Sequence, residues 1–124
     1  MKLSRRILFA AIVAFTAPAF AQTDAQHLTV NMETRGLARR VELGAAQFRP
    51  VGRYQLVELQ AQNVTSRDQH VEYKIDWFDR EGFSVQTAST WQRLHLSPQA
   101  FEAIRSVGQV DTAYSARLTI RDSD

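Results

Sequence analysis

The chain has 124 residues, with 15 lysines and arginines, 13 aspartates and glutamates, and no cysteine. The missing cysteine excludes disulfides, thiol catalysis, cysteine-ligated zinc and the lipid-modified cysteine of a bacterial lipoprotein. Three basic residues and no acidic one fall among the first 21, so the other 12 basic and 13 acidic residues leave a net charge of −1. This balance gives no sign of a nucleic-acid-binding surface, and we expect no nucleic-acid partner.

Residues 1–21 have the three-part layout of a cleavable export signal. A basic start with Lys2, Arg5 and Arg6 precedes an apolar run, Ile7 to Phe15, which is followed by Ala19-Phe20-Ala21. The run is shorter than the ~20 residues that a membrane span needs, so we expect cleavage near Ala21 and a periplasmic location without a membrane anchor. The paired arginines also fit a twin-arginine signal, which leaves two export routes open although the apolar run favours the general one.

Residues 22–124 alternate between apolar and polar side chains, which predicts half-buried strands. The first strand is expected at 28–32, and a second at 37–43 with a bend or bulge near Gly44, where a missing Cβ permits unusual backbone angles. Arg49-Pro50-Val51-Gly52 predicts a type I turn. A long strand should follow with Val57, Leu59 and Ala61 inward, and the polar stretch Asn63 to Asp68 should turn the chain again.

The second half has the same period of two. Val71, Tyr73, Ile75 and Trp77 alternate with polar residues in the clearest strand, which predicts a core position for Trp77. A tight turn at 79–82, a short return strand from Phe83 to Val85, a strand at 94–96 and a last strand at 114–120 are expected, with a frayed tail at 122–124. Ser97-Pro98 resembles a helix start, so 98–107 is open between a short helix and a strand, and the surrounding pattern favours a strand.

Seven or eight short strands separated by turn signals predict one all-β domain over residues 22–124, an immunoglobulin-like antiparallel β-sandwich. One stretch resembles a known family: Val71-Glu72-Tyr73 leads into Trp77-Phe78-Asp79, with Gly82 just after and Trp91 beyond. This pattern is similar to the YcfL-like family of small bacterial periplasmic proteins, and the resemblance spans about 37–120. It implies an immunoglobulin-like sandwich in the cell envelope with no established catalytic activity; family members are often lipoproteins, whereas Gln22 stands at the lipidation position here.

No pattern of catalytic or metal-binding residues stands out. His27, His70 and His95 fall on separate expected strands or strand ends without a close pair such as H-x-x-x-H, so each is expected to be an exposed surface residue and no metal is expected. None of the serines after the signal lies in a nucleophile elbow, and no glycine-rich phosphate loop is present. We therefore expect no enzymatic activity, no catalytic residue and no cofactor. Asn63-Val64-Thr65 fits a glycosylation acceptor, but Asn63 is better explained as a turn residue that bonds its own backbone.

The aromatic residues outside the predicted core are the best candidates for a binding surface. Phe78 has the opposite parity to Trp77, Trp91 precedes an alternating segment, and Tyr54 starts the long strand. Outward aromatic side chains beside polar neighbours can anchor a partner or stack on a sugar. The favoured alternative for two of them is structural: Phe78 would pack under the turn at 79–82, and Trp91 would cap the edge of the sandwich. The leading hypothesis is a non-enzymatic cell-envelope module that binds another protein; the alternative is a small-ligand or glycan-binding domain.

Overall fold

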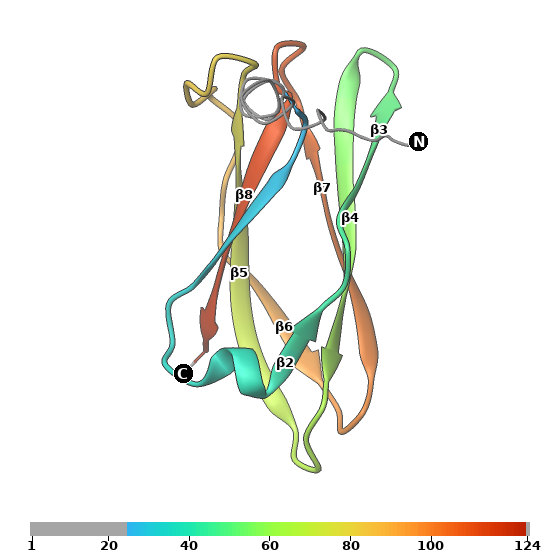
Figure 1. The fold of residues 1–124 in the computed structure, drawn as a ribbon, viewed down its shortest axis with the longest axis vertical. Helices are drawn as coiled ribbons and strands as arrows, with labels where there is room; N and C mark the ends of the chain where they lie inside the picture. Colours follow the sequence, from blue (N-terminus) through green and yellow to red (C-terminus); the bar gives the residue numbers. More distant parts are fainter. Residues whose placement is uncertain (1–24, 124) are drawn as a thin grey trace, which may run out of the picture.

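A computed structural model describes residues 25–123 of the chain. It has eight strands in two four-stranded sheets that face each other (Figure 1), so the prediction of an all-β sandwich is confirmed. The elements are β1 (Leu28–Met32), the 3₁₀ turn η2 (Leu37–Arg39), β2 (Val41–Leu43), β3 (Gln47–Val51), β4 (Tyr54–Asn63), β5 (Gln69–Phe78), β6 (Gln92–Leu96), β7 (Phe101–Gly108) and β8 (Ser115–Asp122).

The first sheet has the order β1-β8-β5-β6, and in the second β4 pairs with β2 and β3 on one side and with β7 on the other. All pairings are antiparallel except one: β1, the first strand, runs parallel to β8, the last. The predicted export signal, residues 1–21, lies outside the described residues. Among the described residues, no helix has the length and apolar character that crossing a membrane requires.

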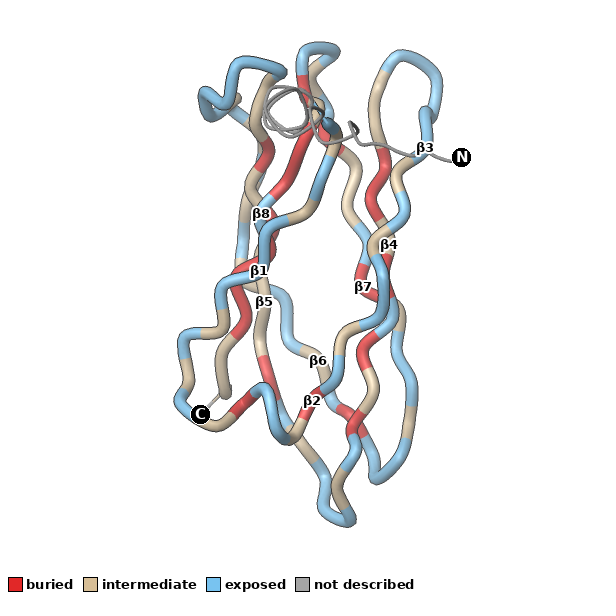
Figure 2. The backbone as a smooth tube through the Cα atoms, viewed as in Figure 1, coloured by how far each residue is buried: buried red, intermediate tan, exposed pale blue. Residues whose placement is uncertain are grey.

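The core lies between the sheets, where the buried residues face one another (Figure 2). Trp77 is its largest member and is 1% exposed, which confirms the core position predicted from strand alternation. The indole Nε1 donates a hydrogen bond of 3.1 Å to Ser106 Oγ on β7, and Phe48 on β3 meets the ring edge-on with centroids 6.1 Å apart. One side chain on β5 therefore contacts two strands of the opposite sheet, which fixes how the sheets stack.

Gly108 is required by the same ring. A Cβ at this position would lie 2.7 Å from Trp77 Cδ2 and 2.7 Å from Ala113 Cβ, closer than non-bonded carbons approach. The absence of a side chain at the end of β7 is thus a packing requirement.

The bend predicted near Gly44 is confirmed. β2 and β3 lie along the same side of β4, β2 beside its end and β3 beside its start, and residues 44–46 interrupt the line between them. Gly44 N–H donates to Gln60 O at 2.8 Å, so the interruption stays attached to β4. Two short segments therefore act as one bent edge strand.

The turn predicted at 49–52 is wrong by two residues. Pro50 and Val51 belong to β3, and the chain reverses at Gly52, whose φ of 61° places it in the left-handed region, with Arg53 beside it. Pro50 is tolerated in β3 because β3 is an edge strand. The N–H that proline lacks would point away from β4, where no neighbouring strand of residues 25–123 accepts a hydrogen bond. A glycine with positive φ in a two-residue hairpin loop is a stronger turn former than a proline two residues earlier.

Four further expectations are corrected or decided by the structure. Residues 37–39 form a 3₁₀ turn rather than the start of a strand, and the return strand at 83–85 is reduced to one bridge between Phe78 and Ser84. The tail is not frayed at its start, because Asp122 belongs to β8 and Ser123 N–H donates to His70 O at 3.0 Å. The open choice at 98–107 is decided in favour of the strand: β7 pairs with β4 over 101–108.

The helix-like signal Ser97-Pro98 has a different structural role. Ala100 N–H donates to Ser97 O at 2.9 Å, and Gln99 has a φ of 66°. Proline at the second position followed by a residue with positive φ is the pattern of a type II turn, which joins β6 to β7.

Candidate functional site

Two of the three predicted interaction residues lie on the same surface, the side of the β1-β8-β5-β6 sheet that faces away from β4, called here the outer face. Phe78 ends β5 with its side chain on this side, opposite in parity to buried Trp77. Trp91 reaches the outer face from just before β6, where it contacts Lys74 of β5 and Arg121 of β8. Both aromatic residues are partly buried.

Tyr54 is not part of that surface. It begins β4 in the opposite sheet, where the Arg53 guanidinium lies 5.5 Å from its ring centroid. A hydrogen bond with Tyr54, followed by the charges of Tyr54 and Asp111, raises the pKa of Arg53 above its ordinary value. The structure therefore brings together Phe78 and Trp91 on one sheet and leaves Tyr54 on the other.

Two cationic side chains contact the Trp91 ring. The Arg121 guanidinium lies 3.6 Å from the indole centroid and the Lys74 ammonium 5.1 Å from it, both within the range of cation–π contacts. Arg121 is held in place by Glu72, whose Oε2 accepts from Nε at 3.0 Å and from Nη2 at 2.9 Å, and Glu33 lies 3.8 Å from Nη1. The indole and guanidinium planes thus form a fixed, amphipathic platform across β5 and β8.

Phe78 lines a shallow hollow of about 230 Å³ at one end of the outer face. Its wall includes Arg80 and Arg117, and the Arg117 guanidinium lies 5.2 Å from the Phe78 ring centroid. The carboxylate of Asp79 also borders the hollow, but its Oδ1 accepts hydrogen bonds from two backbone N–H groups of its own turn, at 3.0 and 2.9 Å. Arg80 stacks on Tyr114 at 4.1 Å, and Arg117 Nη2 lies 3.8 Å from Asp76 Oδ2, so contacts with neighbouring side chains orient both guanidinium groups.

A serine and a histidine meet in the same hollow without forming a catalytic pair. Ser115 Oγ lies 3.4 Å from His27 Nδ1. The same Nδ1 is 2.7 Å from the carbonyl oxygen of Ala25, and a carbonyl only accepts, so Nδ1 carries the proton and cannot accept one from the serine. Ser115 Oγ instead accepts from His27 backbone N–H at 3.2 Å. The absence of enzymatic activity stays a prediction, and this geometry provides no general base for Ser115.

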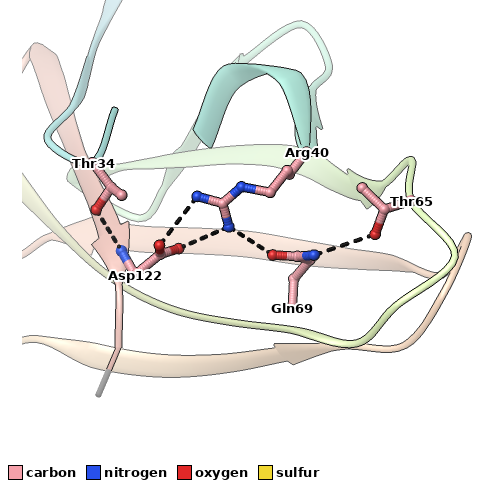
Figure 3. Close-up of polar contacts among 5 residues, drawn as sticks. All are labelled: Thr34, Arg40, Thr65, Gln69 and Asp122. Carbon is pink, nitrogen blue, oxygen red and sulfur yellow. Dashed lines mark hydrogen bonds and ion pairs between the residues drawn. The ribbon is translucent and has the colours of Figure 1, made fainter. Parts of the chain in front are cut away.

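A polar network closes the other end of the sandwich (Figure 3). Arg40 donates to both carboxylate oxygens of Asp122 at 3.1 Å and to Gln69 Oε1 at 2.7 Å. Gln69 Nε2 donates to Thr65 Oγ1 at 3.2 Å, and Thr34 Oγ1 accepts from Asp122 N–H at 2.9 Å. The polar side chains of this network form hydrogen bonds with one another. The network therefore links the end of η2 to β5 and β8 and offers no site for a ligand.

Asn63 adds a link between the two sheets at this end. Its Nδ2 donates to Leu96 O on β6 at 2.9 Å and to Arg67 O at 2.7 Å, and its Oδ1 accepts from Thr65 N–H at 2.9 Å. The prediction of a turn residue that bonds its own backbone is confirmed, and the cross-sheet bond to Leu96 is new. Because Asn63 is 0% exposed, its amide is not available to a glycosylating enzyme in the folded protein.

Sequence reasoning missed the cationic partners of the aromatic residues. Strand parity places Arg117 and Arg121 outward, as it does Phe78, so each could have been assigned to a surface. What parity cannot provide is the register between β5 and β8, which sets Asp76 opposite Arg117 and Glu72 opposite Arg121. It likewise gave no sign that His70 and His95 are register partners on β5 and β6.

The fold and this surface define a small β-sandwich protein whose outer face carries two aromatic side chains, each beside an arginine. Residues 26–122 match the family described as "Protein of unknown function (DUF1425)". The chain belongs to this family.

Solved structures share the fold. A crystal structure of a DUF1425 family member from Shewanella sp. is 20% identical and has a TM-score of 0.63, with 68% of this chain and 79% of that chain covered. A crystal structure of a Campylobacter jejuni protein is 22% identical and has a TM-score of 0.64, with 77% of this chain and 98% of that chain covered. A comparison with curated proteins gives no match.

Proposed function

We propose that this DUF1425 protein is a YcfL-like, periplasmic, non-enzymatic module that binds another protein of the cell envelope through its outer face. The export-signal pattern of residues 1–21 supports the location. The observation that carries the proposal is the position of Phe78 and Trp91 on the same face of one sheet, each with a guanidinium group beside its ring.

The chemistry of the hollow beside Phe78 indicates what kind of segment would bind. Its apolar wall can hold one apolar side chain, while Arg80 and Arg117 present donors suited to a carboxylate. Aromatic and arginine side chains are the residues that most often contribute the largest share of binding energy in protein interfaces. The expected partner is therefore a protein segment with an acidic residue next to an apolar one.

The arrangement of the aromatic residues favours a protein partner over a sugar that stacks on all three rings. A sugar-stacking platform made of Phe78, Trp91 and Tyr54 would need Tyr54 on the same sheet, whereas Tyr54 begins β4 in the opposite sheet. Glycan or small-ligand binding is the second candidate, and it predicts a change in tryptophan fluorescence on titration with sugars or glycan fragments.

In-cell photo-cross-linking tests the proposal directly. A photoreactive amino acid placed at 78 or 91 in the exported protein should give the same protein adduct, identified by mass spectrometry. The matched control is position 60, because Gln60 is exposed on the opposite sheet and should give no such adduct. No adduct from 78 and 91, or the same adducts from all three positions, would contradict the proposal.

A charge test separates a specific contact from collision. Arg117→Ala should reduce the yield of the adduct from position 91 by about tenfold, because it removes one charge-assisted contact to the partner, worth about 1.5 kcal/mol. Arg49→Ala, on the exposed edge strand β3 of the other sheet, should leave the yield unchanged. Equal yields from both variants would mean that the Phe78 hollow does not bind the partner.

A further inference from the structure

His70 and His95 form a cross-strand pair at the opposite end of the outer face from Phe78. They are register partners on β5 and β6. The carbonyl of His70 accepts from Ser123 N–H at 3.0 Å and so faces β8, which makes the pair with His95 a non-hydrogen-bonded one. Such pairs have the closer Cα spacing, about 4.5 Å, and bring side chains together. The two imidazole rings accordingly stack, with centroids 4.6 Å apart and an angle of 4° between planes.

Asp68 completes a three-residue group. Its Oδ2 lies 3.3 Å from His95 Nε2, and one ligand atom from each of Asp68, His70 and His95 falls within 4.8 Å of the others. All three side chains are exposed, about half of the surface of His95 and Asp68 being open to solvent at 52% and 53%. An incoming ion can therefore reach the group without any opening of the fold.

The backbone that carries these side chains is held rigidly. Gln69, between Asp68 and His70, is bonded by Arg40 at 2.7 Å and bonds Thr65 at 3.2 Å (Figure 3). Leu96, next to His95, is 0% exposed, and its carbonyl accepts from Asn63 Nδ2 at 2.9 Å. Fixed neighbours on both strands reduce the entropy that would be lost when the three side chains converge on an ion.

We propose that Asp68, His70 and His95 bind a divalent transition-metal ion, with Zn²⁺ or Cu²⁺ as the ion that fits best. Two imidazoles and one carboxylate are ligands that these borderline ions prefer, while Mg²⁺ and Ca²⁺ require oxygen ligands only. Metal–nitrogen bonds of ~2.1 Å in tetrahedral geometry put two donor atoms roughly 3.4 Å apart. The pair at 3.3 Å already fits, and rotation of the exposed His70 ring can bring the third donor inward.

Three protein ligands leave at least one coordination position for water or for a group on another molecule. Arg93 lies two residues before His95 and borders the same surface, with Glu72 opposite it in register, so the neighbouring positions carry one charge of each sign. The site is distinct from the Phe78 hollow and does not depend on the function proposed for that hollow.

Titration of the purified, untagged full-length chain with Zn²⁺, followed by isothermal calorimetry, tests the site. We expect one site that Mg²⁺ and Ca²⁺ do not occupy. Binding should weaken by at least about tenfold in His70→Asn and in His95→Asn, and by less in Asp68→Asn. His27→Asn is the matched control, because His27 lies before β1 and outside the group, and it should bind Zn²⁺ as the unaltered protein does. The proposal would be overturned if His27→Asn and the double variant His70→Asn/His95→Asn bound Zn²⁺ with equal affinity. It would also be overturned if neither variant bound Zn²⁺ measurably.

A spectroscopic measurement on the unaltered protein guards against variants that fail to fold. One equivalent of Cu²⁺ should give an electron paramagnetic resonance spectrum with coupling to two imidazole nitrogens. A spectrum of hydrated Cu²⁺, or of a single nitrogen ligand, would overturn the proposal whatever the variants do.

Discussion

Replacing Asn63 with alanine should destabilise the domain strongly, because one buried amide connects the two sheets. The substitution removes the donor to Leu96 O, which lies in a buried environment at 2.9 Å from Nδ2, and leaves that carbonyl without its side-chain partner. The Leu96 carbonyl keeps its backbone partner, because Gln69 and Leu96 form the hydrogen-bonded pair next to His70 and His95. The loss is therefore that of one buried hydrogen bond, ~0.5 to 1.5 kcal/mol, and the space left by the amide adds about 1 kcal/mol. The bonds to Arg67 O and Thr65 N–H lie at the edge of the fold, where water can replace them, and they add about 1 kcal/mol between them.

The expected loss is therefore about 2 to 4 kcal/mol, a large part of the ~5 to 15 kcal/mol by which domains are stable. For a domain of this size it corresponds to a fall in Tm of roughly 10 to 25 °C. Urea unfolding followed by circular dichroism should show a lower midpoint with an unchanged slope, since the surface exposed on unfolding stays the same.

Gln62→Ala is the matched control. Gln62 precedes Asn63 in β4 and its side chain has the outward parity, so its removal should change the free energy of unfolding by no more than about 0.5 kcal/mol. A loss below about 1 kcal/mol in Asn63→Ala, at the same slope, would refute the reasoning that the buried bond to Leu96 O links the sheets with a net stabilisation.

Three other substitutions test the core and its edge. Gly108→Ala places a Cβ 2.7 Å from the Trp77 ring and should lower the free energy of unfolding by about 1 to 3 kcal/mol, measured by thermal unfolding. Gly44→Ala is the control and should lower it by less, because its Cβ would lie 3.6 Å from the nearest atom. Ser106→Ala leaves the buried Trp77 Nε1–H without its acceptor and should cost ~1 to 3 kcal/mol, measured by urea unfolding. Burial raises the pKa of Tyr73, so the stability that depends on its neutral phenol is complete below about pH 10 and is lost as the pH rises further. Tyr73→Phe should therefore reduce the loss of stability at alkaline pH, measured by urea unfolding across that range. An unchanged loss would mean that another group causes it.

The strands could be predicted from the sequence because the alternation of apolar and polar side chains is a local pattern. Val71 to Trp77 and the residues around Leu118 alternate as half-buried strands must, and both segments are central strands of one sheet. Turns were harder where two signals competed. Ser97-Pro98 satisfies both a helix start and a type II turn locally, and the pairing of β7 with β4 along eight residues decides between them.

The candidate site depends on register, which no local pattern contains. Parity assigns Trp91, Arg121 and Lys74 to a surface one at a time, but their stacking requires knowing that β8 lies next to β5. The same is true of His70 and His95, which are 25 positions apart along the chain and are placed opposite each other only by the β5–β6 pairing. Long-range pairing is set by the packing of the whole sandwich, so the residue types were predictable and their meeting was not.

The parallel pairing of β1 with β8 ties the beginning of the domain to its end. Gln26 and Tyr114, which bond at 2.8 Å, are 88 positions apart, and β1 has its sheet neighbour only in the last strand to be made. Contacts of such long range form slowly, and the first sheet cannot be complete until β8, its last strand in the chain, has been made. The order of the strands thus delays the closing of this sheet until the end of synthesis.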